Sequence, residues 1–120
     1  MASILVVDDD APIRALLRCI LEADGHQVRE AANGHMSLLL YREAPADLVI
    51  TDILMPERDG MEVTLALTQE FLDAKVIAMT GAIGDQNFLN VARFFGARQV
   101  IQKPFTVQEI RHLVRFTLEH

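Results

Sequence analysis

The sequence contains no tryptophan, one tyrosine, one cysteine and only two lysines among its 120 residues. The lone Cys19 excludes an internal disulfide and favours a cytoplasmic protein. We interpret Cys19 as flanking the core face of a helix. No apolar run approaches the ~18 residues of a transmembrane helix, and no signal peptide precedes the first predicted strand. The sequence therefore predicts a protein that neither crosses nor is exported across a membrane.

Positive charge is scarce, with 11 basic residues against 17 acidic ones and a net charge of −6. Direct nucleic-acid binding needs a basic face that neutralises phosphates, so this class of partner is excluded. Adhesion to an anionic membrane surface is excluded for the same reason. Half of the residues are hydrophobic, which is ordinary for one globular domain of this length.

Short apolar runs alternate with helix-period segments along the whole chain. The runs predict strands at 3–7, 26–31, 47–51, 75–80 and 98–102. Helices are predicted at 11–24, 34–43, 60–71, 85–95 and 106–118. Three strands are almost continuously apolar, which is typical of a parallel sheet covered on both faces. This pattern predicts an α/β fold, a doubly wound five-stranded parallel sheet with five helices. The strand order that we expect is the flavodoxin-like one, 2-1-3-4-5, in which the first and third strands are neighbours.

Start and stop signals agree with these boundaries. Asp10 is expected to cap the first helix, with Pro12 in its first turn. Thr106 and Glu109 have capping-box spacing before the last helix, and Asp59 precedes the helix at 60–71. Gly25 and Gly96 stand where helices should end. We expect one domain over 1–118, with 118–120 as either a native helix end or a tag remnant.

Polar residues cluster at the ends of the predicted strands. Ligands of such sheets bind outside the carboxyl ends of the strands, near the point where the strand order reverses. The residues at those ends are Asp8, Asp9, Asp52, Thr80 and Lys103. Two carboxylates at about 4 Å repel by roughly 4 kcal/mol at an effective dielectric constant of 20. Oxygen ligands without His or Cys therefore favour a bound hard cation, Mg²⁺ or alternatively Mn²⁺.

This arrangement suits phosphoryl chemistry. A carboxylate beside a divalent ion is oriented and charge-compensated, so Asp52 could attack phosphorus. Thr80 offers a hydroxyl donor, Gly81 leaves room for a phosphoryl oxygen, and Lys103 offers a positive charge. Simpler roles are a strand residue for Thr80, a surface lysine for Lys103 and a helix cap for Asp10. The bond between Lys103 and Pro104 is a candidate cis peptide.

Four segments, ILVVDD, DLVITDILMPERDG, VIAMTG and QKPF, together resemble the receiver domain of two-component response regulators in order and spacing. The resemblance implies that Asp52 is the phosphoacceptor. It also implies that Asp9, Asp52 and the carbonyl of Leu54 hold Mg²⁺, with Asp8 acting through a water. Thr80 and Lys103 would bind the phosphoryl oxygens.

The implied donor is a sensor histidine kinase or a histidine phosphotransfer protein. The implied output is a partner or effector domain at the 85–118 face, where switching involves 80–118, and a phosphorylation-dependent dimer is a further option. The chain would be a phosphoacceptor that assists its own phosphotransfer and autodephosphorylation, not an enzyme acting on other substrates.

The sequence departs from the family pattern at three positions. Val100 replaces an aromatic residue common three positions before the lysine, which puts an aromatic switch in doubt. Leu54 and Ala82 stand where relatives often have polar residues, which bears on phosphoryl lifetime. Two other functions are alternatives: a haloacid-dehalogenase-like phosphatase with Asp8 as nucleophile and Asp10 as acid, and a degenerate receiver that acts purely as an interaction module.

Overall fold

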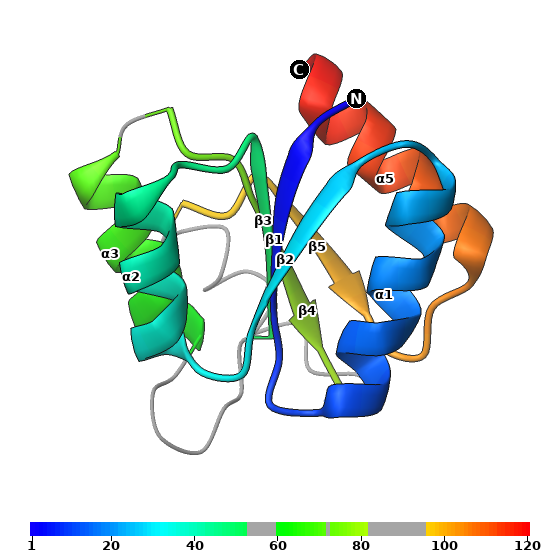
Figure 1. Ribbon diagram of the computed structural model, residues 1–120, viewed down its shortest axis with the longest axis horizontal. Helices are drawn as coiled ribbons and strands as arrows, with labels where there is room; N and C mark the ends of the chain where they lie inside the picture. Colours follow the sequence, from blue (N-terminus) through cyan, green and yellow to red (C-terminus); the bar gives the residue numbers. More distant parts are fainter. Residues whose placement is uncertain (53–59, 72, 82–95) are drawn as a thin grey trace.

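The computed structural model describes residues 1–52, 60–71, 73–81 and 96–120, with only the backbone described at 60–64. Five parallel strands form one sheet in the order β2-β1-β3-β4-β5 (Figure 1). The strands are β1 Ser3–Val7, β2 Gln27–Ala31, β3 Leu48–Asp52, β4 Val76–Thr80 and β5 Gln99–Gln102. The predicted fold class and strand order are confirmed, and each strand differs from its predicted bounds by at most one residue at either end.

Helices cover both faces of the sheet. The described helices are α1 Ala11–Ala23, α2 Gly34–Glu43, α3 Gly60–Glu70 and α5 Val107–Glu119. Helices α1 and α5 lie on one face, and α2 and α3 lie on the other (Figure 1). The helix predicted at 85–95 lies outside the described residues. Helix α5 continues through Leu118, which packs against the core, and Glu119 is its last residue.

Alternating side chains of the central strands fill two cores. Leu5 and Val7 of β1 face the core beneath α2 and α3, whereas Ile4 and Val6 face the one beneath α1 and α5. All four side chains are completely buried. Because a strand turns successive side chains to opposite faces, a continuous apolar run is required when both faces are covered. The double core therefore explains the unbroken apolar strands of the sequence.

The predicted helix-capping residues are confirmed only in part. Thr106 accepts a hydrogen bond from the amide of Glu109 at 3.0 Å, as a capping residue does. Asp10 occupies the N-cap position of α1, and Pro12 lies in the first turn, but the Asp10 side chain makes no capping bond. The prediction for Asp10 is wrong in this respect, because its side chain is exposed and accepts no amide of the first turn, while its backbone amide donates to the carboxylate of Asp8. Asp59 lies outside the described residues.

Gly25 and Gly96 have positive φ angles, which glycine adopts more readily than other residues. Gly25 follows α1 with φ of 89°, as predicted for a helix end. Gly96 has φ of 111°, and a Cβ there would lie 2.7 Å from side-chain atoms of Thr68 on α3. Gly96 therefore permits both the left-handed backbone and the close approach to α3.

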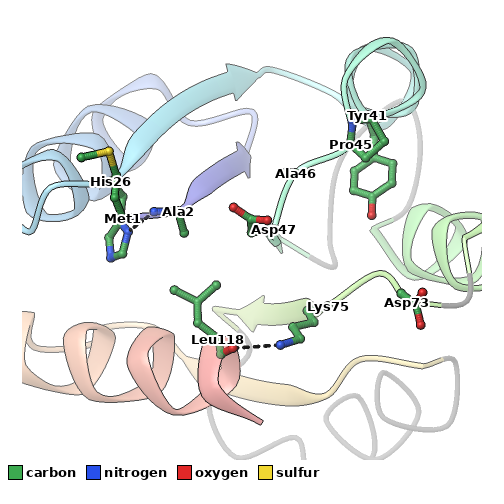
Figure 2. A pocket seen from close by; sticks show the side chains of 10 residues that line it. All are labelled: Met1, Ala2, His26, Tyr41, Pro45, Ala46, Asp47, Asp73, Lys75 and Leu118. Carbon is green, nitrogen blue, oxygen red and sulfur yellow. Dashed lines mark hydrogen bonds between the residues drawn. The ribbon is translucent and has the colours of Figure 1, made fainter.

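The amino ends of the strands border a cavity of about 620 Å³ (Figure 2). Two bonds at this edge tie the ends of the chain to the sheet. His26 Nδ1 accepts from the amide of Ala2 at 3.1 Å, and Lys75 Nζ donates to the carbonyl of Leu118 at 2.9 Å. The cavity lies at the opposite edge of the sheet from Asp8 and Asp52. Within the described part of the chain, no helix is long and apolar enough to cross a membrane.

Candidate functional site

The strand register brings the predicted site residues to one edge of the sheet. Val7 of β1 pairs with Thr51 of β3, so the residues that follow them, Asp8 and Asp52, lie side by side. Asp52 is the last residue of β3 and Thr80 the last of β4. Lys103 directly follows β5. The reversal of strand order between β1 and β3 thus places two carboxylates at the sheet's expected ligand position.

Asp8 is completely buried, and both of its carboxylate oxygens have partners. Oδ2 accepts from Lys103 Nζ at 2.8 Å, and Oδ1 accepts from the amide of Asp10 at 2.9 Å. A buried carboxylate without such partners would carry a large desolvation cost. The Asp8 side chain is therefore held in place, and its negative charge is paired with Lys103.

Lys103 joins Asp8 to the second strand-end carboxylate. Its Nζ also donates to Asp52 Oδ2 at 3.1 Å. Burial lowers the pKa of Lys103, but the hydrogen bond to Asp8 and the charges of Asp52 and Asp8 outweigh burial, so its pKa lies above the ordinary value. Lys103 is thus a protonated bridge rather than a surface lysine. The Lys103–Pro104 peptide bond is cis in the structure.

Three carboxylates converge at this edge. One oxygen each from Asp8, Asp9 and Asp52 lie within 4.8 Å of one another. Three negative charges against the single ammonium of Lys103 leave two negative charges uncompensated. A hard divalent cation would neutralise that excess, and an all-oxygen donor set without His or Cys suits Mg²⁺. The residues present therefore fit the predicted ion.

Thr80 and Gly81 complete the described edge. Thr80 is completely buried, and its carbonyl accepts from the amide of Lys103 at 2.7 Å, which couples the ends of β4 and β5. A Cβ at Gly81 would meet no atom within 4 Å, so the space beside this backbone is open. Val100 is half-buried and packs on the core beneath α3. Leu54 and Ala82 lie outside the described residues.

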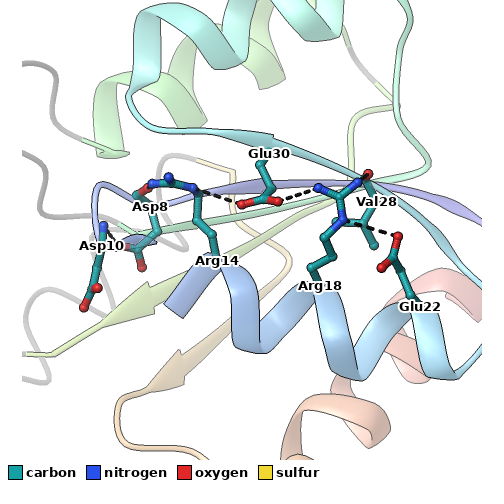
Figure 3. Close-up of polar contacts among 7 residues, drawn as sticks. All are labelled: Asp8, Asp10, Arg14, Arg18, Glu22, Val28 and Glu30. Atoms are coloured by element: carbon teal, nitrogen blue, oxygen red, sulfur yellow. Dashed lines mark hydrogen bonds and ion pairs between the residues drawn. The ribbon is translucent and has the colours of Figure 1, made fainter. Parts of the chain in front are cut away.

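A charged network that the residue pattern did not predict lies behind Asp8 (Figure 3). Arg14 of α1 donates through Nη1 to the carbonyl of Asp8 at 2.6 Å and through Nε to Glu30 Oε1 at 3.1 Å. Arg18, one turn later, donates to the other oxygen of Glu30. The four-residue spacing of the two arginines was the available signal, but it did not reveal that β2 supplies their shared carboxylate.

Comparison with known proteins defines the family. Residues 4–115 match the family described as response regulator receiver domain, and the chain belongs to that family. The chain is 37% identical to the chemotaxis protein CheY of Bacillus subtilis over 116 residues, which cover 96% of each chain. It is 36% identical to the probable transcriptional regulator ycf27 of Pyropia yezoensis, covering 96% of this chain but only 46% of that relative.

The solved structures agree with the sequence comparison. The response regulator protein TrrA from Thermotoga maritima, in complex with Mg²⁺–BeF, superimposes with a TM-score of 0.88 and 33% identity. The match covers 98% of this chain and 99% of that one. The protein is a receiver domain, and its function is phosphorelay signal transduction as a phosphoacceptor. Receiver domains bind Mg²⁺ through an acidic cluster, which Asp8, Asp9 and Asp52 form here.

Proposed function

We propose that Asp52 accepts the phosphoryl group from a phosphohistidine of a sensor histidine kinase or a histidine phosphotransfer protein. The observation that carries this assignment is that Asp52 belongs to the acidic cluster and contacts Lys103, with 7% of the residue exposed. Asp8 is completely enclosed, and Asp9 is exposed without a contact to Lys103. Asp52 thus keeps some exposure to solvent and also contacts the ammonium group of Lys103.

The proposed transfer forms one bond and breaks one. An oxygen of the Asp52 carboxylate attacks phosphorus, the bond from phosphorus to the donor imidazole nitrogen breaks, and the imidazole leaves with the electron pair and takes up a proton. Lys103 already contacts the Asp52 carboxylate and is placed to follow charge onto the phosphoryl oxygens. The Thr80 hydroxyl and the open space at Gly81 would accommodate another of these oxygens.

Asp9 and Asp52, with the carbonyl of Leu54, would hold Mg²⁺ directly, and Asp8 would act through a water. Mn²⁺ would suit the same oxygen ligands. When bound, the ion neutralises charge on the reacting oxygens. The similarity to TrrA, solved with Mg²⁺–BeF, supports this assignment. Asp8 holds Lys103 at the same time, so one carboxylate would orient both positive charges of the site.

The readout would run through the 80–118 face to a partner or effector domain. Thr80 ends β4 and is joined through its carbonyl to Lys103, so a displacement of Thr80 would be felt at the end of β5. Val100 is too small to fill the space that an aromatic side chain would take. We therefore assign the switch to movement after Thr80 rather than to an aromatic rotamer, and we assign residues 1–118 to one receiver unit.

The two other functions have weaker support. A phosphatase using Asp8 as nucleophile would need a free carboxylate oxygen, whereas both oxygens of Asp8 are buried and engaged. A degenerate receiver has no need of a converged acidic cluster with a bridging lysine, and Asp8, Asp9, Asp52 and Lys103 are all in place.

Incubation with Mg²⁺ and acetyl phosphate, followed by intact-mass spectrometry, tests the proposal. We expect one phosphoryl group on the wild type and none on Asp52→Asn. Asp47→Asn is the matched control, because Asp47 is an exposed aspartate at the opposite edge of the sheet. Equal labelling of Asp52→Asn would overturn the assignment, and an unlabelled wild type would favour the interaction module.

A further inference from the structure

The carbonyl of Asp8 is held by a side chain rather than by a neighbouring strand. Strand pairing between β1 and β2 ends at Val7 and Ala31, and the amide of Asp8 still reaches the carbonyl of Ala31 at 3.1 Å. The carbonyl of Asp8 lies beyond the paired residues, and Arg14 Nη1 donates to it at 2.6 Å. The Arg14 side chain thus extends the hydrogen bonding of the sheet to the carbonyl of the next residue, at the point where the acidic cluster begins.

Glu30 fixes the direction of Arg14. Its carboxylate accepts from Arg14 Nε at 3.1 Å, while the Arg14 side chain is 18% exposed (Figure 3). The hydrogen bond to Arg18 lowers the pKa of Glu30, burial opposes it, and Arg14 adds to the lowering, so Glu30 is ionised at neutral pH. An arginine carries several donors in one rigid plane, so a bond to Glu30 at one nitrogen aims another at the Asp8 carbonyl.

Asp9 depends on this carbonyl for its position. The Asp9 side chain is exposed and makes no hydrogen bond or ion pair with any other described residue. Because the peptide unit between Asp8 and Asp9 is planar, holding the Asp8 carbonyl also sets the amide and the Cα direction of Asp9. The backbone, held here by Arg14, therefore sets the point from which the Asp9 side chain extends toward the cluster.

We propose that Arg14, aimed by Glu30, is a positioning residue that fixes the peptide between Asp8 and Asp9 and so places the Asp9 carboxylate for Mg²⁺. The metal role of Asp9 rests on the proposed function, but the positioning itself is measurable without phosphorylation. Partners that orient metal ligands typically change metal affinity by about 10–100-fold when they are removed.

Arg18 provides a matched control. It binds the same Glu30, and also Glu22 and the carbonyl of Val28, but it has no contact with Asp8 (Figure 3). Arg14→Ala and Arg18→Ala each remove one positive charge and one partner of Glu30. A purely structural role of the network predicts similar effects of the two variants, whereas positioning predicts an effect on Mg²⁺ binding in Arg14→Ala alone.

The proposal is tested by calorimetric titration with Mg²⁺ and by hydrogen exchange of the backbone amides at residues 8–10. We expect the Mg²⁺ dissociation constant to rise on the order of tenfold in Arg14→Ala and less than about twofold in Arg18→Ala. The amide of Asp10, which is bonded to Asp8, should exchange faster only in Arg14→Ala. Arg14→Lys keeps the positive charge and one donor nitrogen, so it should recover part of the affinity for Mg²⁺.

Equal weakening by both alanine variants would overturn the proposal. Tighter Mg²⁺ binding in Arg14→Ala would also overturn it, because it would show that Arg14 acts by repelling the cation. If Arg14→Ala does not fold, Arg14→Lys and Arg18→Lys are compared in the same way. Failure of the wild type to be phosphorylated on Asp52 would refute the proposed function while leaving these binding and exchange results interpretable.

Discussion

Lys103 is the internal counter-charge of the acidic edge. It bridges Asp8 and Asp52, and its side chain is 19% exposed whereas that of Asp8 is completely enclosed. Removing one member of a buried ion pair leaves the other charge desolvated and uncompensated, which typically costs about 3–5 kcal/mol. Since Lys103 retains some access to water, a smaller cost is expected here.

We predict that Lys103→Met lowers the free energy of unfolding by about 2 kcal/mol without Mg²⁺, below the range for fully buried pairs. Mg²⁺ should restore more stability to this variant than to the wild type, because the ion then compensates a larger negative charge. Urea unfolding with and without Mg²⁺ measures both effects. Lys75→Met is the control, since the chain's other lysine binds the carbonyl of Leu118 at the opposite edge. Equal Mg²⁺ responses of wild type and Lys103→Met would contradict this account.

Glu30 should make the protein's stability depend on acid pH. The hydrogen bond to Arg18 lowers the pKa of Glu30 in the folded state below its ordinary value of 4.5, with burial opposing and Arg14 adding to the effect. A carboxyl group with a lowered folded pKa contributes stability above its unfolded pKa and loses it as pH falls through the folded pKa. Glu30→Gln should therefore be less stable than wild type at neutral pH.

The difference between Glu30→Gln and wild type should shrink as the pH falls below about 4.5. Urea unfolding across this range measures it. Glu70→Gln serves as the comparison, because Glu70 pairs with Arg42 at an exposed site where solvent screens the interaction. A constant difference between wild type and Glu30→Gln down to low pH would show that Glu30 does not act through its charge.

At the scale of elements, local pattern predicted the five strands and the four described helices well. The apolar residues Leu17, Ile20 and Leu21 of α1 recur at helical spacing and are buried. Leu16 follows the same spacing but is 46% exposed. Periodicity gives the direction of a helix face and not the width that its neighbours cover.

Capping depended on contacts that sequence spacing does not specify. Thr106 makes the predicted bond to Glu109, but Asp10 does not cap α1 with its side chain. The Asp10 side chain is exposed instead, and the backbone amide of Asp10 donates to the buried carboxylate of Asp8. The Arg14–Glu30 contact was not predicted either, since it joins α1 to β2 across 16 positions of the chain. Such contacts exist only once the sheet has assembled.

We predict different effects for substitutions at the two N-cap positions. Thr106→Ala should lower the free energy of unfolding by about 1 kcal/mol, the usual value for a lost side-chain cap. Asp10→Ala should change it by less than about 0.5 kcal/mol, because no capping bond is lost and the residue is exposed. Chemical denaturation of both variants decides this. Equal losses would mean that Asp10 caps α1 in solution.

At the scale of the molecule, different groups of residues lie at the amino and carboxyl ends of the strands. At the amino edge, His26 and Lys75 tie the two chain ends to the sheet, and at the carboxyl edge the acidic cluster gathers. The sequence predicted the carboxyl edge because parallel strands bring their ends together regardless of detail. It could not predict that Lys103 bridges Asp8 and Asp52 but makes no bond to the third carboxylate, Asp9.

We predict that Mg²⁺ stabilises the whole domain by relieving repulsion in this cluster. A ligand at 100 times its dissociation constant adds about 2.7 kcal/mol. Asp9→Asn should raise the melting temperature without Mg²⁺ and abolish the response to the ion. Thermal melts with and without Mg²⁺ measure both. Asp10→Asn is the control and should keep the response, because the neighbouring Asp10 is not part of the cluster. A full response in Asp9→Asn would exclude Asp9 as a ligand.

The most direct test of the account is the position of the phosphoryl group. Borohydride reduces an aspartyl phosphate to homoserine, so peptide mapping after phosphorylation and reduction identifies the modified residue. The assignment of Asp52 as phosphoacceptor predicts homoserine at position 52 alone, only when Mg²⁺ and the phosphodonor are both present. Homoserine at position 8 or 9, or a phosphorylated protein without any homoserine, would contradict it.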